Sequence, residues 1–325
     1  MSKERLELAL QQAARSGVWL VLNPNADMDF ADLGSAVSVS YDAISAATIA
    51  ARGGQVVQTI PQTADQAVVF IPRAKPLAQA WIAAAMRATN GGPVLVDGQK
   101  TDGIDSLLKA CKTRTQVTDV IANSHGKAFW MQGSADDFAD WAEPAPRAVG
   151  DGLQTRVGVF SADGIDPASA LLASNLPDKL AGRVADLGAG WGYLSAALLH
   201  RSKITAIELV EADHRALECA RSNITDTRAE FTWADVLTWS PKTPVDVVVM
   251  NPPFHTGRNA DPDLGRGFIT SAARALTPKG HLYMVANRHL PYEPTLEAAF
   301  AKVQMIGGDN RFKLIHASGP RLKRG

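Results

Sequence analysis

Two apolar runs in the second half of the chain each end abruptly in residues that cannot continue a strand. The first reads VADLGAGWG at residues 184–192 and the second reads VVVMNPPF at residues 247–254. In an open α/β sheet, ligands bind just beyond the carboxyl ends of the strands. The two runs therefore predict two such strand ends, one that holds a cofactor and one that holds a planar amine.

The first run ends in a glycine-rich loop. Gly188, Gly190 and Gly192 follow the predicted strand and precede a predicted helix from Tyr193 to Leu199. Glycine permits φ > 0 and lets backbone approach a ligand closely. A bare G-x-G-x-G would also suit a dinucleotide, but an acidic residue, Asp186, precedes the first glycine, and Tyr193 stands where a third dinucleotide-type glycine belongs.

The pattern D-x-G-x-G-x-G after a strand resembles motif I of the class I S-adenosylmethionine (SAM) methyltransferases. That resemblance implies a SAM site that runs from Asp186 through Leu187, Gly188, Ala189 and Gly190 to Gly192. A tight strand–helix turn without a ligand is the alternative. Trp191 departs from the small residues that are usual in this loop, and it puts the packing of the adenosyl group in question.

The next predicted strand, residues 204–210, is β-branched and mostly apolar, as expected of a buried strand. It ends at Glu211, and a carboxylate at that tip can accept hydrogen bonds from both ribose hydroxyls. Glu208 and Asp213 are alternative candidates for this role. A carboxylate that only complements the dipole of the following helix is the other alternative.

Two further segments extend the predicted cofactor site. Asp235, followed by Val236, ends a third predicted strand and resembles the residue that binds the adenine amine. Phe160 to Asp166 form a loop before motif I that is expected to cover the cofactor. Asp166 is also expected to cap a helix over residues 168–176, with Pro167 at its first position.

The second run ends in Asn251-Pro252-Pro253-Phe254. Two prolines lack the donors that a central strand needs, so the strand ends and presents Asn251 at its tip. The Asn251 side-chain oxygen and the Pro252 carbonyl can accept the two N–H bonds of a planar amine and aim its lone pair at the sulfonium methyl group. Phe254 can stack on the base. A proline-stiffened turn with a capping Asn is the alternative.

Substrate contacts are expected outside this motif as well. His255 follows the catalytic loop and is a candidate contact to the base or to phosphate. Arg311 and Lys313 belong to a basic stretch near the end of the chain, for which phosphate contact is one interpretation and a solvated tail is the other. The seven histidines show no ligand spacing, so no metal is expected.

Composition places the chain among ordinary proteins of the reducing cytosol. Its 325 residues predict two domains of roughly 150 residues each. The net charge of zero offers no global attraction to nucleic acid, so RNA contact must come from local patches. The two cysteines lack metal-type spacing, the first 15 residues read as a polar helix and not a signal peptide, and no apolar run has the ~20 residues of a membrane span.

The first half, residues 1–150, reads as a parallel α/β domain that repeats the layout of the second half, residues 151–325. Residues 67–73, AVVFIPR, parallel the second run, with Ile71 where Asn251 would stand. The first half has no D-x-G-x-G-x-G. We therefore expect a degenerate methyltransferase-like domain that binds neither SAM nor the substrate amine, unless the likeness of two α/β domains is accidental.

These motifs together resemble the ribosomal RNA guanine-N2 methyltransferases of the RsmC and RlmG type. The residues that carry the resemblance are 160–166, 186–192, 251–255, 285–287, 290–292, 308 and 311–313. The resemblance implies two tandem class I, Rossmann-like methyltransferase domains, of which the second is catalytic. It also implies methyl transfer from SAM to a guanine N2 amine in rRNA, most closely 16S rRNA, with rRNA or the 30S subunit as partner, in the cytoplasm.

Two other readings remain open at this point. One is a large-subunit rRNA methyltransferase, and the other is an assembly factor that binds SAM or RNA without turnover. An intact Asn251 motif favours an enzyme, because a binding protein needs no group that orients an amine. The same N-P-P-[FY] motif also serves methylation of DNA adenine and of protein glutamine.

Overall fold

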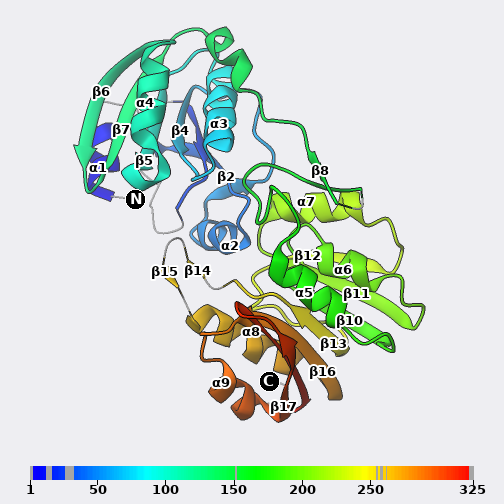
Figure 1. Cartoon of the computed structure of the whole chain (residues 1–325). Helices are drawn as coiled ribbons and strands as arrows, with labels where there is room; N and C mark the ends of the chain where they lie inside the picture. The colour runs from blue at the N-terminus through cyan, green and yellow to red at the C-terminus, as the bar shows by residue number, and fades with distance from the viewer. Residues whose placement is uncertain are drawn as a thin grey trace. The chain divides into compact units, whose positions relative to one another are not determined.

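The computed structural model describes residues 3–11, 17–25, 33–150, 152–253, 255–256, 259–260 and 262–321. The chain divides into two compact units, Met1–Pro146 and Arg147–Gly325. Within the described residues each unit is built on one seven-stranded sheet with helices against it (Figure 1). The division falls inside the proline-containing segment at residues 140–152, where the sequence suggests a linker.

The first unit alternates strands and helices for most of its length. Its elements are α1 (Lys3–Leu10), β1 (Val18–Leu22), β2 (Ser35–Val39), α2 (Ala43–Ala51), β3 (Gln55–Val57), β4 (Gln66–Phe70), α3 (Lys75–Ala88), β5 (Val94–Gln99), α4 (Ile104–Lys112), β6 (Gln116–Asn123) and β7 (Gly126–Gln132). Two 3-10 helices, η2 and η3, span Lys100–Asp102 and Ala135–Trp141. The strand order is β3-β2-β1-β4-β5-β7-β6.

The second unit opens on a short antiparallel pair and then builds its own large sheet. Its elements are β8 (Arg147–Val149), β9 (Leu153–Thr155), α5 (Pro167–Asn175), β10 (Gly182–Leu187), α6 (Tyr193–Leu198), β11 (Ile204–Glu211), α7 (His214–Asn223), β12 (Ala229–Trp233), β13 (Val245–Met250), β14 (His255–Thr256), β15 (Asn259–Ala260), α8 (Pro262–Ala275), β16 (Leu276–Asn287), α9 (Glu293–Ala299), β17 (Phe300–Gly308) and β18 (Phe312–Pro320). The large sheet has the order β12-β11-β10-β13-β16-β18-β17.

The two large sheets have the same strand order when their strands are counted from the start of each unit. Strand β4 corresponds to β13, so Ile71 follows the last residue of its strand just as Asn251 does. The tandem architecture expected from the sequence is confirmed. Ile71 is 6% exposed and offers no acceptor where Asn251 offers an amide.

The parallel sheet expected for the first unit is wrong for one strand, β7, and therefore for two of the strand pairings. Strand β7 pairs antiparallel with both β5 and β6. Strands β6 and β7 are joined by a tight turn at Ser124 and His125, both with positive φ (49° and 56°), and such turns connect antiparallel neighbours. Strands β2 and β3, which are not predicted from the sequence, extend the other edge of the sheet.

Helices cover the second sheet (Figure 1), and an apolar cluster lies on each of its two faces. Helices α8 and α9 bury residues such as Phe268 and Leu296 against one face. Helices α5, α6 and α7 bury residues such as Leu172, Leu198 and Leu217 against the other. The alternation of side chains along β13 puts Val248 and Met250 on the first face and Val247 and Val249 on the second, and this two-sided burial explains its unbroken apolar sequence.

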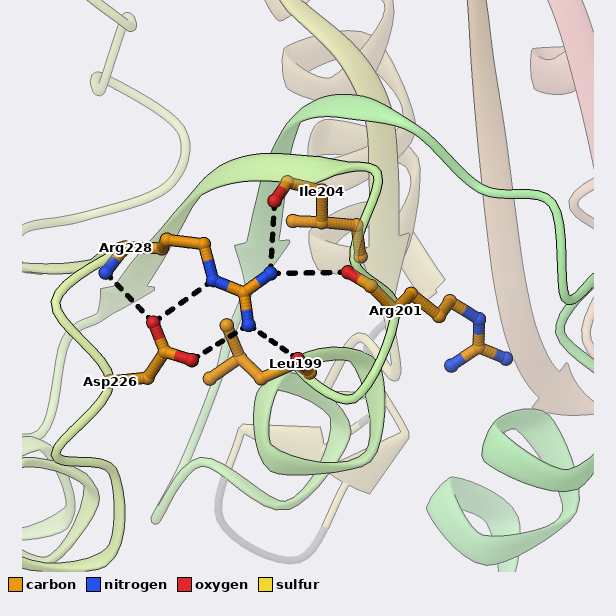
Figure 2. Close-up of polar contacts among 5 residues, drawn as sticks. All are labelled: Leu199, Arg201, Ile204, Asp226 and Arg228. Carbon is orange, nitrogen blue, oxygen red and sulfur yellow. Dashed lines mark hydrogen bonds and ion pairs between the residues drawn. The ribbon is translucent and has the colours of Figure 1, made fainter.

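One arginine, Arg228, connects the loops that precede β11 and β12 (Figure 2). Arg228 donates to the carboxylate of Asp226 and to the carbonyls of Leu199, Arg201 and Ile204. The hydrogen bond from Arg228 lowers the pKa of Asp226 to about 2. Arg228 thus satisfies carbonyls at the end of α6 that have no partner inside the helix. It also holds the amino ends of β11 and β12, at the end of the strands opposite to the one that carries the motifs.

Among the described helices, none combines the length and apolar character needed to cross a lipid bilayer.

Candidate active site

The glycine loop lies between β10 and α6 and is fixed by the tip of β11. The backbone N–H groups of Gly188 and Ala189 both donate to the Val210 carbonyl, at 2.9 and 3.1 Å. Gly188, Gly190 and Gly192 have φ of 72°, 55° and 88°. Residues other than glycine rarely adopt these angles, so the loop needs its glycines for the turn itself.

The three glycines differ in what surrounds them. A Cβ added at Gly192 would meet the Ile224 side chain at 2.9 Å, and one at Gly188 would meet the Phe268 ring at 3.2 Å. A Cβ at Gly190 would meet nothing within 4 Å in the described part of the chain. Gly190 therefore marks the point where the loop backbone is open to a ligand.

Asp186 lies beneath the loop and is completely buried. Ser195 Oγ, in the first turn of α6, donates to Asp186 Oδ2 at 2.7 Å. The other carboxylate oxygen, Oδ1, has no hydrogen-bond partner among the described residues. Burial raises the pKa of Asp186 to about 7. A buried carboxylate with an unused acceptor suits a cationic or hydrogen-bond-donating ligand.

Glu211 ends β11 and contacts the glycine loop directly. Its two carboxylate oxygens accept hydrogen bonds from the backbone N–H groups of Gly190 (2.7 Å) and Asp213 (2.8 Å). Burial raises the pKa of Glu211 to about 6, against these two hydrogen bonds, which lower it.

The alternative carboxylates at this tip have other partners. Glu208 accepts hydrogen bonds from Thr232 Oγ1 at 2.7 Å and from Trp239 Nε1 at 3.1 Å. Asp213 caps α7 by accepting from the Arg215 backbone N–H at 2.9 Å. The geometry therefore favours Glu211 for a ligand held at the glycine loop.

Asp235 and Val236 follow β12 at the same edge of the sheet. Asp235 is partly buried, and its Oδ1 accepts the backbone N–H of Leu237 at 2.9 Å. Val236 is 2% exposed and belongs to the core cluster beneath α8. The backbone N–H of Ala234, just before Asp235, donates to the Glu211 carbonyl at 3.0 Å, so Asp235 lies next to the end of β11, and its contact with adenine stays a prediction.

Trp191 connects the glycine loop to the loop before motif I. Its ring is 3% exposed and packs with Val159 and Cys219, and its Nε1 donates to the Phe160 carbonyl at 3.1 Å. The Phe160 side chain is itself 59% exposed. The unusual tryptophan is thus a buried anchor that holds the 160–166 loop next to the glycines.

Asn251 directly follows β13 beside the glycine loop, because Met250 pairs in register with Leu187. Its Nδ2 donates to Asp166 Oδ2 and to Ser169 Oγ, both at 2.9 Å. Pro252 is buried and Pro253 is exposed. Phe254 lies outside the described residues. Ser169 is not predicted from the sequence, because nothing local indicates that a serine in a first helical turn contacts a residue 82 positions later.

The remaining predicted substrate contacts differ in their surroundings. His255 is placed in β14 by its backbone, and its side chain is outside the description. Arg311 is exposed, with its guanidinium 4.8 Å from the Phe312 ring centroid. Lys313 is 3% exposed, and its Nζ donates to the Leu290 carbonyl and to Glu293, both at 2.6 Å. Lys313 therefore ties β18 to the loop before α9 and to the first residue of α9, and its ammonium group is not presented to solvent.

The site fits the cofactor that motif I implies. Gly190 leaves the loop open, Asp186 has an unused acceptor, and Glu211 and Asp235 stand at the tips of the next two strands. No three of the described His, Cys, Asp and Glu side chains are grouped so that they could hold a metal ion.

Comparison with known proteins agrees with this arrangement. The family model "Methyltransferase small domain" matches residues 152–316, and "Methyltransferase small domain N-terminal" matches residues 17–140. The chain is 32% identical over 262 residues to a protein of Shewanella sp. (strain MR-4) named ribosomal RNA small subunit methyltransferase C, which covers 77% of this chain and 76% of that one. The protein of that name from Shewanella oneidensis is 30% identical over 260 residues, covering 77% and 75%.

A solved structure has the same fold over nearly the whole chain. It is the T. thermophilus 16S rRNA N2 methyltransferase RsmC in complex with AdoMet and guanosine. The TM-score is 0.80, with 24% identity, over 96% of this chain and 90% of that one.

Proposed function

The chain belongs to the family of the ribosomal RNA small subunit methyltransferases C, whose methyltransferase small domain it carries in its second half, and from this premise we propose that it transfers a methyl group from SAM to the exocyclic N2 amine of a guanine in 16S rRNA. The observation that carries the proposal is Asn251 at the tip of β13. Its amide nitrogen is held by Asp166 and Ser169, which leaves its carbonyl oxygen as an acceptor beside the glycine loop.

An acceptor at this position solves the chemical problem of a guanine amine. The N2 lone pair is delocalised into the ring, so the nitrogen is a weak nucleophile. Asn251 Oδ1 and the Pro252 carbonyl accept its two N–H bonds, orient the lone pair, and favour the positive charge that develops on nitrogen. The methylated nitrogen is strongly acidic and loses a proton to water, so no side-chain base is required.

The rest of the site holds the cofactor, which when bound supplies an electrophilic methyl group on a sulfonium sulfur. Glu211 would accept the ribose hydroxyls and Asp235 the adenine amine. Gly190 allows close approach of backbone, and Asp186 offers its unused oxygen beneath the loop. These assignments rest on the match of each residue to motif positions and on the geometry described above.

The target base must leave its stack to reach a site at the strand tips. A guanine N2 amine lies in the minor groove of a helix, and extrusion costs a few kcal/mol. Stacking on Phe254 would offset about 1–3 kcal/mol. Exposed Arg311, directly before β18, is our candidate for contact with flanking phosphates. We further propose that the substrate is rRNA or the 30S subunit in the cytoplasm, and that no metal takes part.

We propose that the first unit is a degenerate copy without a SAM site. Ile71 replaces the catalytic Asn251 after the corresponding strand, and β1 is followed by Asn23-Pro24-Asn25 in place of a glycine loop. Such a unit would support folding of the second unit or docking of RNA.

Mass mapping of modified guanosines in rRNA tests the proposal. Cells without this protein should lack one N2-methylguanosine in 16S rRNA, and purified protein with SAM should restore it on 16S rRNA or 30S subunits. Restoration only on 23S rRNA would point to a large-subunit enzyme. Methylation of adenine or of protein glutamine alone would refute the guanine assignment.

A further inference from the structure

The side-chain amide of Asn251 is fixed by two residues at the start of α5, the N-cap Asp166 and Ser169 in the first turn. Asp166 Oδ2 and Ser169 Oγ each accept a hydrogen bond from Asn251 Nδ2 at 2.9 Å. A primary amide nitrogen carries two hydrogens, so both are engaged. We call Asp166 and Ser169 together the amide clamp.

The clamp determines which end of the amide faces the substrate. If the Asn251 amide rotated by half a turn, its Oδ1 would face the Asp166 carboxylate, which can only accept when ionised. That repulsion excludes the rotated state. The rotated Asn251 amide would also present an N–H donor to the substrate amine, whose own two hydrogens need acceptors. The orientation of Asn251 that chemistry needs is therefore the one that the clamp selects.

We propose that Asp166 and Ser169 are positioning residues for methyl transfer, which act through Asn251 and not by contact with cofactor or base. The proposal rests on the proposed function of Asn251. Because the reacting groups must be held in a near-attack geometry, small misplacements reduce the rate strongly. We expect loss of the Ser169 hydroxyl to lower kcat roughly tenfold, and loss of the Asp166 contact to lower it roughly a hundredfold.

Asp166 has a second task that must be separated from the first. The same Oδ2 accepts the backbone N–H of Ser169 at 2.8 Å and so caps α5. Serine caps helices about as well as aspartate, but its side chain is too short to reach Asn251 as well. Asp166→Ser should therefore keep the cap and remove the clamp.

The test compares kcat on 16S rRNA, SAM dissociation constants and thermal unfolding for five full-length proteins and one further control variant. They are wild type, Ser169→Ala, Asp166→Ser, Asn251→Ala and the double variant Ser169→Ala/Asn251→Ala. Ser174→Ala is the matched control, because Ser174 is an exposed serine of the same helix whose hydroxyl donates to the Leu171 carbonyl and accepts from its neighbour Asn175, and neither contact involves Asn251. We expect lowered kcat in the clamp variants, SAM affinity within about twofold, and unchanged kcat in the control.

The double variant gives the readout that a purely structural role would not produce. If Ser169 acts through Asn251, Ser169→Ala should lower kcat in the wild-type background and leave it unchanged in the Asn251→Ala background. Equal losses in both backgrounds would overturn the proposal. A SAM dissociation constant that rises in Asp166→Ser as much as kcat falls would reassign Asp166 to the cofactor and overturn its positioning role.

A second measurement does not depend on turnover. With nitrogen-15 label in asparagine, and Asn251→Ala to assign the signal, hydrogen exchange of the Asn251 side-chain amide should be slow in wild type and faster in Ser169→Ala. Unchanged exchange overturns the clamp. If the wild type methylates no rRNA while this exchange responds as expected, the proposed function fails and the clamp stands.

Discussion

The backbone N–H of Gly190 donates to Glu211 Oε2 at 2.7 Å, so the glycine loop is held directly by the acidic residue at the tip of the neighbouring strand. This contact joins two motifs that are 21 residues apart in the chain. Because of this contact, a ligand bound at the glycine loop would lie within reach of both the loop backbone and the Glu211 carboxylate. Burial raises the pKa of Glu211 to about 6. Burial also raises the pKa of Asp186, which lies beneath the glycine loop, to about 7.

These raised pKa values predict pH-dependent cofactor binding. Near pH 6 the free protein holds protons on Asp186 and Glu211, and a cationic cofactor favours their ionised forms, so binding releases protons. The affinity for SAM should therefore rise with pH up to about 7 and level off above it, by on the order of tenfold between pH 5.5 and 8. Calorimetry at pH 6.5 in buffers of different ionisation enthalpy measures the released protons.

The Glu211→Gln protein is the control for that experiment. It should release fewer protons at pH 6.5 and bind SAM more weakly at pH 8. Buffer-independent enthalpy in the wild type would show that neither carboxyl titrates on binding. The stability of the free protein changes with pH in the opposite direction to the SAM affinity. Carboxyls whose pKa is raised by folding stabilise the folded protein below about pH 4, and this contribution is lost as pH rises to about 7.

Gly190→Arg should abolish SAM binding while the protein stays folded. Space for a side chain exists at Gly190 in the described structure, but the arginine would occupy the place where the ligand approaches. The φ of 55° adds strain of roughly 1–2 kcal/mol for a residue other than glycine. Gly190→Ala, which carries the same strain with a smaller side chain, is the matched control. Calorimetry with SAM decides, and unaltered affinity in Gly190→Arg would refute the assignment.

The same Gly190→Arg protein tests the first unit. If the first unit is a degenerate copy, full-length Gly190→Arg should bind no SAM in equilibrium dialysis with labelled cofactor, and wild type should bind one equivalent. One equivalent bound by Gly190→Arg, or two by the wild type, would place a second site outside the glycine loop.

Asn251→Ala should lower the rate of methyl transfer by about two to three orders of magnitude, the loss that follows removal of one preorganised group at the transition state. SAM affinity should stay within a few-fold of wild type. Single-turnover methyl transfer to 16S rRNA, paired with SAM calorimetry, measures both. A wild-type rate in the variant would make Asn251 a structural residue.

Arg311 and Lys313 should behave differently although they are two residues apart. Lys313→Met leaves the Leu290 carbonyl without its buried donor, which should reduce the free energy of unfolding by roughly 1–3 kcal/mol. Arg311→Gln should leave stability unchanged and weaken rRNA binding with a shallower salt dependence. Urea unfolding and filter binding at several salt concentrations distinguish them. A folded Lys313→Met protein with a selectively reduced salt slope would restore Lys313 to the RNA contacts.

The sequence by itself determined the local structure around both motifs. Glycines followed by a helix, an acidic residue after a β-branched strand, and two prolines after Asn251 each constrain the backbone within a few residues. Strands β10, β11 and β13 therefore end where the sequence predicts. The repeated layout of the two halves was visible for the same reason, since strand and helix periods are local properties.

The tertiary structure decided which of these local pieces act together. The sequence favours Glu211 and keeps Glu208 and Asp213 as alternatives, and the packing of β12 against β11 engages Glu208 with Thr232, whereas Glu211 contacts the glycine loop at Gly190. Likewise Lys313 is buried and Ser169 contacts Asn251 because distant segments meet. Hydrogen bonds between residues 20 to 85 positions apart depend on strand order and register, and no local pattern encodes them.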